Sequence, residues 1–113
     1  MPFINMKVNV RLDKVLKDKF SENIISIAGE TLGKGETWVM TGIEDDSYLY
    51  FRGSSDKAAM VEVKLYGDCG SSAYTKMTGK ICDLINAELK IPQDRIYVAY
   101  LPLDNWGYAG SNF

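Results

Sequence analysis

Apolar and polar residues alternate in two short segments, one at the start of the chain and one near its middle. The alternating apolar positions are Ile4, Met6 and Val8 in the first segment, and Val61, Val63 and Leu65 in the second. Alternation with a period of two places the apolar side chains on one face of an extended segment. The pattern therefore predicts two β-strands, which lie 57 positions apart, as Ile4 and Val61 do.

A helical periodicity follows each strand at the same offset. The apolar residues that superpose without a gap are Phe20 on Met77, Ile24 on Ile81, Ile25 on Cys82, Ile27 on Leu84, Ala28 on Ile85 and Leu32 on Leu89. Their spacing predicts one helix from about Asp13 to Leu32, stopped by Gly33. It predicts a second helix that starts near the Gly70-Ser71-Ser72 cap and ends before Pro92.

The offset also covers the strands after the helices, because it places Val39 on Ile96 and Met40 on Tyr97. Each half is therefore predicted to be a β-α-β unit whose two strands lie parallel after a right-handed crossover. A hairpin partner is expected around Tyr48-Leu49-Tyr50-Phe51. The predicted fold class is α+β, with a mixed sheet and two helices on one face, in a single domain of residues 1–113.

The alternation also defines the second face of the sheet. The side chains left on that face are polar, namely Asn5, Lys7, Asn9, Glu62 and Lys64. A sheet that contains parallel strands is usually covered on both faces. We therefore expect this face to meet other subunits or a water-filled channel.

Composition narrows the classes of function. The formal net charge is −2 with acidic and basic residues interspersed, so the chain lacks the basic surface that binds nucleic acid. No run approaches the roughly 20 apolar residues that cross a bilayer, and the start has no basic-then-apolar leader. These features predict a cytoplasmic protein without membrane insertion. Cys69 and Cys82 are the only cysteines, and we expect both to be reduced and structural.

The chain contains no histidine, and its start offers another base. Removal of Met1 would leave Pro2 with a free secondary amine, and α-amino groups ordinarily titrate at about pH 7.7–8.0. Burial or a nearby cation would lower that pKa and make the amine neutral at neutral pH. A processed terminus with no catalytic role is the alternative.

Several segments, taken in order, resemble those of a known family. They are Met1-Pro2, Leu32-Gly33-Lys34, Phe51-Arg52-Gly53-Ser54-Ser55-Asp56, Pro92-Gln93-Asp94-Arg95-Ile96-Tyr97 and Trp106-Gly107-Tyr108-Ala109-Gly110-Ser111-Asn112-Phe113. Their order and spacing over essentially the whole chain resemble the macrophage migration inhibitory factor and D-dopachrome tautomerase family, within the tautomerase superfamily. The resemblance implies a homotrimer with sites at the subunit interfaces.

The resemblance also implies a reaction and its residues. Family members use the processed N-terminal proline as a base that moves a proton between carbon and oxygen in phenylpyruvate-like aromatic 2-keto acids, with dopachrome as a further substrate and no cofactor. The resemblance implies that Pro2 is the base and that Lys34 is the cation beside it. It also implies that Tyr97 is a hydrogen-bonding tyrosine contributed by an adjacent subunit. The substrate-binding aromatic residues that it implies are Tyr66, Trp106, Tyr108, Phe113 and, at the rim, Trp38.

The same residues could have purely structural roles, and the chain differs from the family pattern at several positions. Lys34 would otherwise be an ordinary helix-end cation, and the aromatic residues would pack in a subunit interface. Ala99 stands where relatives have a substrate-binding asparagine, Tyr108 where many have tryptophan, and Gly35 where proline is usual. We expect the change at Ala99 to weaken binding and the one at Gly35 to loosen the loop of the lysine. Residues 58–61 contain no Cys-x-x-Cys pair.

Two other segments have simpler explanations than a binding site. Glu44-Asp45-Asp46 is expected to be a solvated turn, so no metal site is predicted. Gly67-Asp68-Cys69-Gly70-Ser71-Ser72 lacks the lysine of a phosphate-binding loop, and its serines are expected to cap the following helix.

Catalysis is not the only function that the resemblance implies. The alternative is a cytokine-like signalling or interaction protein with a weak or vestigial pocket, which binds a receptor and is secreted without a signal peptide. A carrier of small aromatic acids is a third hypothesis. Turnover that depends on Pro2 would distinguish an enzyme from a signalling protein and from a carrier. None of the three hypotheses identifies the physiological substrate.

Overall fold

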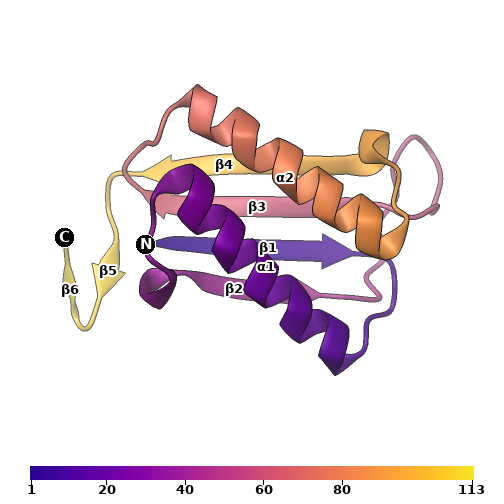
Figure 1. Cartoon of the computed structure of the whole chain (residues 1–113), viewed down its shortest axis with the longest axis horizontal. Coiled ribbons are helices and arrows are strands. Elements are labelled where there is room, and N and C mark those ends of the chain that lie inside the picture. Colours follow the sequence, from indigo (N-terminus) through magenta and orange to yellow (C-terminus); the bar gives the residue numbers. More distant parts are fainter.

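Two helices cover one face of a four-stranded sheet in the computed structural model, which describes residues 1–113 (Figure 1). The strands are β1 (Pro2–Val8), β2 (Met40–Glu44), β3 (Ala59–Tyr66) and β4 (Ile96–Leu103), in the spatial order β2-β1-β3-β4. The helices are α1 (Lys14–Leu32) and α2 (Ser71–Leu89). Short 3₁₀ turns, η1 (Glu36–Trp38) and η2 (Gln93–Arg95), precede β2 and β4.

Strand directions confirm the predicted mixed sheet of two β-α-β units. β1 is parallel to β2, and β3 is parallel to β4, so each helix connects two parallel neighbours. β1 and β3 are antiparallel at the centre, with Pro2 opposite Leu65 and Val8 opposite Ala59. The N-terminus and the end of β3 therefore lie at the same end of the sheet (Figure 1).

The repeat of 57 positions extends to the boundaries of the elements. The bounds of α1 and η1, each shifted by 57, give the bounds of α2 and η2. The residues that follow the helices, Gly33 and Lys90, are both left-handed, with φ of 67° and 58°. Gly33 is thus the predicted stop of α1, whereas α2 ends at a lysine in a conformation that glycine adopts more readily.

The core lies between the sheet and the helices, as the alternation predicts. The strand side chains that are 0% exposed are Ile4, Met6, Val8, Val61, Val63 and Leu65. Phe20 of α1 and Ile85 of α2 are also 0% exposed, and full burial of such a side chain contributes about 1.5–3 kcal/mol. The outward faces of the helices are polar, and no helix is long and apolar enough to cross a membrane.

Aspartates fix the turns at which the two helices begin. Asp13 caps α1, because its carboxylate accepts the N–H of Leu16 at 2.9 Å. The prediction that serines cap α2 is wrong, because Gly70 is the N-cap and makes no side-chain cap. The carboxylate of Asp68 instead accepts the N–H of Gly70 at 2.9 Å and the hydroxyl of Tyr74 at 2.7 Å, which fixes the preceding turn.

The predicted hairpin partner at Tyr48–Phe51 is also wrong. These residues join no strand of the sheet, and Phe51 forms only an isolated bridge with Ser54. Tyr48 and Tyr50 are 91% and 75% exposed. Within one chain, therefore, only Leu49 and Phe51 of this apolar segment are partly buried.

Residues 104–113 form a feature that the sequence pattern did not predict. β5 (Gly107–Tyr108) and β6 (Ser111–Asn112) pair as a small antiparallel hairpin. The N–H of Phe113 donates to the carbonyl of Trp106 at 3.1 Å, which closes the hairpin on its own base. The hairpin lies beyond the end of the sheet at which β1 begins (Figure 1).

Candidate functional site

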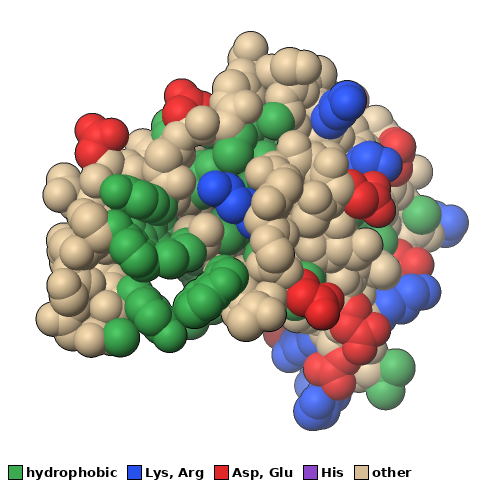
Figure 2. Space-filling model, turned by 60° about the vertical axis from the view of Figure 1, so that its left-hand side comes forward, with side chains coloured by type: hydrophobic (Ala, Val, Ile, Leu, Met, Phe, Trp, Pro, Cys, Tyr) green, Lys and Arg blue, Asp and Glu red, His purple; other side chains and the backbone are tan.

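A cavity of about 540 Å³ opens at the end of the sheet where β1 begins. β1, the segment around η1 and the C-terminal hairpin supply its lining, which consists of Met1, Pro2, Phe3, Thr37, Trp38, Val39, Met40, Trp106, Gly107 and Tyr108. Figure 2 brings this end forward and shows hydrophobic side chains gathered around a hollow, with basic side-chain atoms close by. The volume falls within the range of small-molecule sites.

Pro2 is buried at the first position of β1 and lines the cavity. A proline is tolerated at a strand start, where its missing N–H disturbs the ladder least. While Met1 is attached, the nitrogen of Pro2 is an amide and has no basic lone pair. Removal of Met1 would create an amine at the same position, beside the cavity.

The surroundings of the amino terminus favour a neutral amine. Burial lowers the pKa of the Met1 amino group below its ordinary value of 8.0, and the positive charge of Lys34 lowers that pKa further. Cys69 acts in the opposite direction and raises the pKa of the same group. Lys34 itself is half-buried and follows the left-handed turn at Gly33, which ends α1.

The aromatic residues predicted to bind substrate form a chain of ring contacts. Trp38 meets Tyr108 edge-on, with ring centroids 5.4 Å apart and an interplanar angle of 88°. Tyr108 stacks on Phe113 at 6.4 Å, and Phe113 meets Tyr66 at 5.4 Å. Trp106 lines the same cavity. The structure thus brings all five of these residues to the end of the sheet where the cavity lies.

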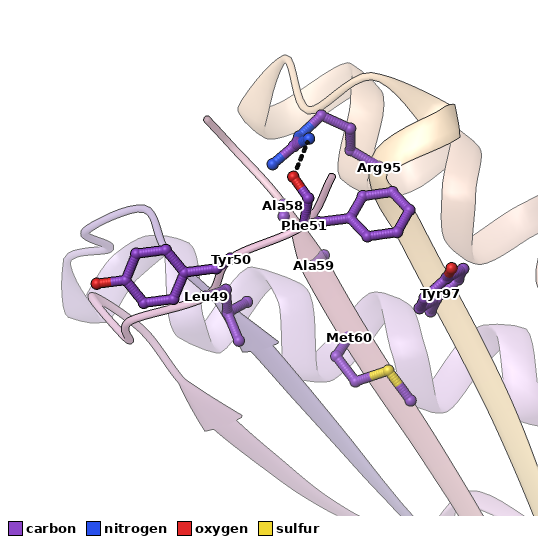
Figure 3. Close-up of a pocket in the computed structure, with 8 residues that line it drawn as sticks. All are labelled: Leu49, Tyr50, Phe51, Ala58, Ala59, Met60, Arg95 and Tyr97. Carbon is purple, nitrogen blue, oxygen red and sulfur yellow. Dashed lines mark hydrogen bonds between the residues drawn. The ribbon is translucent and has the colours of Figure 1, made fainter. Parts of the chain in front are cut away.

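Tyr97 lies at the opposite end of the sheet. It pairs with Met60 of β3, which pairs with Lys7 of β1, so Tyr97 and Pro2 are separated by about 17 Å along the strands. Tyr97 lines a second, apolar cavity of about 110 Å³ (Figure 3). Within one chain the structure does not bring Tyr97 to Pro2, and its assignment to a neighbouring site stays a prediction.

The two cavities occupy equivalent places in the two halves of the chain. The lining residues related by the offset of 57 are Met1 and Ala58, Pro2 and Ala59, Phe3 and Met60, Trp38 and Arg95, and Met40 and Tyr97. The larger cavity lies where β1 begins and where β2 follows η1. The smaller cavity lies at the opposite end of the sheet, where β3 begins and where β4 follows η2.

The departures from the family pattern are compatible with the local backbone. Gly35 has φ of −62° and ψ of 141°, a conformation that proline adopts, so this position does not require glycine. Its repeat equivalent is Pro92, with φ of −59° and ψ of 141°. Ala99 lies on β4 opposite Glu62, on the strand that carries Tyr97.

Sequence reasoning missed several residues of this region. Thr37, Val39 and Met40 line the cavity, and Cys69 is close enough to the amino terminus to influence its pKa. The first three lie within two positions of Trp38, so their proximity to a predicted rim residue was an available signal. Nothing in the sequence pattern places Cys69 near Met1, because the two come together only when β1 and β3 pair.

Comparisons with known proteins extend over the whole chain. The family model described as macrophage migration inhibitory factor (MIF) matches residues 1–113. Macrophage migration inhibitory factor of Xenopus laevis is 30% identical, over 100% of this chain and 99% of its own length. The crystal structure of Leishmania major MIF2 gives a TM-score of 0.93 at 38% identity, covering 100% of this chain and 97% of that one.

A homologue from Prochlorococcus marinus gives a TM-score of 0.87 at 32% identity and covers 98% of each chain. Sequence and fold therefore agree from end to end, including the N-terminal strand and the C-terminal hairpin that enclose the larger cavity. On these grounds the chain belongs to the macrophage migration inhibitory factor family.

Proposed function

We propose that the protein is a keto–enol tautomerase whose base is the amine of Pro2, exposed by removal of Met1. Its substrates are phenylpyruvate-like aromatic 2-keto acids, with dopachrome as a further one. The observation that carries the proposal is the buried position of Pro2 in the wall of the larger cavity, next to the Met1 amino group, whose pKa is lowered first by burial and then by Lys34. A neutral amine is the form that accepts a proton, so these surroundings suit a general base.

The reaction relocates one proton and requires no oxidant or reductant. The neutral nitrogen of Pro2 removes a proton from the carbon next to the keto group, and the electron pair of that C–H bond forms the carbon–carbon double bond. The carbonyl π electrons move to oxygen, which then takes the proton from the protonated amine and becomes the enol hydroxyl. The reverse sequence converts enol to ketone.

Lys34 and the aromatic walls would bind the substrate. The ammonium group of Lys34 pairs with the carboxylate or with the negative charge that develops on oxygen. Trp38, Trp106 and Tyr108 provide flat apolar surfaces for the substrate ring and exclude water, which strengthens the charge interactions inside the cavity.

We infer that the active unit is a homotrimer in which Tyr97 of the partner subunit donates a hydrogen bond to the substrate oxygen. Three features support association. Tyr97 is 60% exposed, Tyr48 and Tyr50 are more exposed still, and the second face of the sheet has no helix over it. Closed symmetric assembly would bury such surfaces.

The direct test is the ultraviolet rate of phenylpyruvate tautomerisation by the Met1-processed protein. Replacing the base with Pro2→Gly is expected to lower the rate by about 100-fold or more. A matched control retains Pro2 but inserts one alanine before it, so that the processed chain begins Ala-Pro and the proline nitrogen stays an amide. Mass spectrometry of each protein verifies the terminus.

Loss of the rate in both variants would support the proline base. A full rate in either variant would show that Pro2 is not the base. If the processed wild-type chain has no rate above buffer, the tautomerase proposal is wrong, and receptor binding that survives Pro2→Gly would then favour the signalling alternative.

A further inference from the structure

Arg95 has an unusual set of partners for a half-buried arginine on a protein surface. It is the last residue of η2 and directly precedes β4. Its guanidinium donates to four backbone carbonyls, which are those of Lys57 (from Nε, 2.9 Å), Phe51 (from Nη1, 3.0 Å), and Ser54 and Asp56 (both from Nη2, 3.3 and 3.0 Å). The donors of this side chain are thus committed to one loop of its own chain.

These hydrogen bonds fix the conformation of residues 51–57. The loop turns sharply, because Arg52 and Gly53 both have positive φ, at 53° and 72°. Phe51 and Ser54 exchange their N–H and carbonyl groups across this turn, at 2.9 and 3.1 Å. The planar fork of Arg95 then binds the carbonyl groups on both sides of the turn, which a flexible point charge would not do with the same geometry.

The anchored loop carries the ring that contacts Tyr97. Phe51 meets Tyr97 edge-on, with ring centroids 5.0 Å apart and an interplanar angle of 67°, and the guanidinium of Arg95 lies 5.3 Å from the centroid of Phe51 (Figure 3). Tyr97 is 60% exposed, so few contacts within the chain restrict its side chain. The packing of Phe51 therefore has a large share in setting its direction.

We propose that Arg95 is a positioning residue for Tyr97, acting through the loop 51–57 and the ring of Phe51. The inference rests on the proposed function, in which the hydroxyl of Tyr97 reaches the substrate of a neighbouring cavity. It also explains a difference between the halves of the repeat. Trp38 lines the larger cavity, whereas its equivalent, Arg95, lines the smaller one and in addition points its donors into the loop that borders Tyr97.

The test compares Arg95→Lys with Arg52→Lys. Lysine at position 95 retains the charge but loses the planar fork. Arg52 is a matched control, because its guanidinium also lies over the ring of Phe51, at 5.2 Å, but it donates its hydrogen bond to the exposed Asp94 and not to the loop carbonyls. If Arg95→Lys does not fold, Arg95→Gln, which retains a planar pair of donors, takes its place.

The first readout does not depend on catalysis. In protein labelled with ¹³C in its tyrosine rings, the Tyr97 signal is assigned by its absence in Tyr97→Phe. We expect Arg95→Lys to shift this signal as the ring current of Phe51 changes, and Arg52→Lys to leave it in place. An unchanged Tyr97 signal in a folded Arg95 variant would overturn the proposal, whether or not the protein is an enzyme.

The second readout is a double-mutant cycle on phenylpyruvate turnover. Arg95→Lys is expected to lower kcat/KM by about fivefold to tenfold, the effect of one misplaced hydrogen bond, and by less than about twofold when Tyr97→Phe is already present. An equal loss in both backgrounds would mean that Arg95 acts on the fold in general and would overturn the proposal. A wild-type chain without Pro2-dependent turnover would instead defeat the proposed function, and the tyrosine signal would then decide on Arg95.

Discussion

Lys34 and the amino terminus share one end of the sheet, so the positive charge of the lysine influences the pKa of the terminal amine. An ammonium group at the terminus is repelled by the lysine, whereas a neutral amine is not. Burial acts in the same direction and is the larger cause of the lowered pKa, while Cys69 opposes both. The pH at which the terminus becomes a base is therefore sensitive to a single side chain.

Lys34→Met should move the acidic limb of the kcat/KM profile to higher pH. The amine works as a base only above its pKa, and loss of the neighbouring cation raises that pKa, so activity present at a given pH in the wild type is lost there in the variant. Lys34→Arg retains the charge and should leave the limb in place. An acidic limb at the same pH in all three proteins would contradict the role of this charge in setting the pKa.

The chemistry-bearing residues differ in how well the sequence indicates them. Pro2 and Lys34 could be predicted because a recognisable motif surrounds each, and the structure places both at one end of the sheet. Cys69 could not, because its nearness to Met1 depends on strand pairing between distant segments. Tyr97 is an intermediate case, since its strand was predicted but its distance from Pro2 within one chain follows only from the observed register.

At the scale of elements, short connections set where the site residues lie. The link from α1 to η1 contains Gly33 and Gly35, which differ in what they require of the backbone. Gly33 is left-handed, with φ of 67°, whereas Gly35 is extended, with φ of −62°. A Cβ added at either position meets nothing within 4 Å, so conformation and not space decides which substitution is tolerated.

Gly35→Pro is expected to raise the free energy of unfolding by about 0.4–1 kcal/mol, because proline restricts the unfolded chain and fits the native φ. Pro92, at the equivalent place in the second half, already has this conformation. Gly33→Ala is the matched control and should lower the free energy of unfolding, because alanine is strained at positive φ. Chemical denaturation measures both, and destabilisation by Gly35→Pro would contradict this account of the connection.

Elements with a long periodic pattern were predictable, and short ones were not. Both helices match the prediction to within a residue or two, because their apolar faces persist over several turns. The segment Tyr48–Phe51 has a strand-like composition but pairs with no strand of the sheet, and Tyr48 and Tyr50 are exposed. The C-terminal hairpin has two-residue strands, which are too short for any alternation to indicate them.

For the molecule as a whole, the proposed site is divided between subunits. Pro2 and Tyr97 lie at opposite ends of one sheet, so the homotrimer that we propose would combine the larger cavity of one chain with the Tyr97 end of another. Residues that never meet within a chain would then act on one substrate. Such a division has a direct consequence for mixtures of variants.

Mixed trimers of Pro2→Gly and Tyr97→Ala chains should be more active than the average of the two variants measured separately. With random mixing at equal amounts, about a quarter of the sites combine a native Pro2 from one chain with a native Tyr97 from the next. Unfolding and refolding the variants together, with each variant refolded alone as the control, measures the gain. Activity no higher than the average would mean that both residues serve a site within one chain.

The repeated architecture also sets the stoichiometry of the chemistry. The equivalent of Pro2 in the second half is Ala59, which opens β3 from inside the polypeptide, so its nitrogen is an amide under all conditions. The two equivalent cavity positions thus differ in their chemistry. The nitrogen of Pro2 becomes a base when the single peptide bond to Met1 is hydrolysed, whereas the nitrogen of Ala59 cannot become one. A covalent inhibitor that binds in the larger cavity and reacts with the proline amine should accordingly saturate at one equivalent per polypeptide, and a preparation that retains its initiator methionine should take up none at this proline.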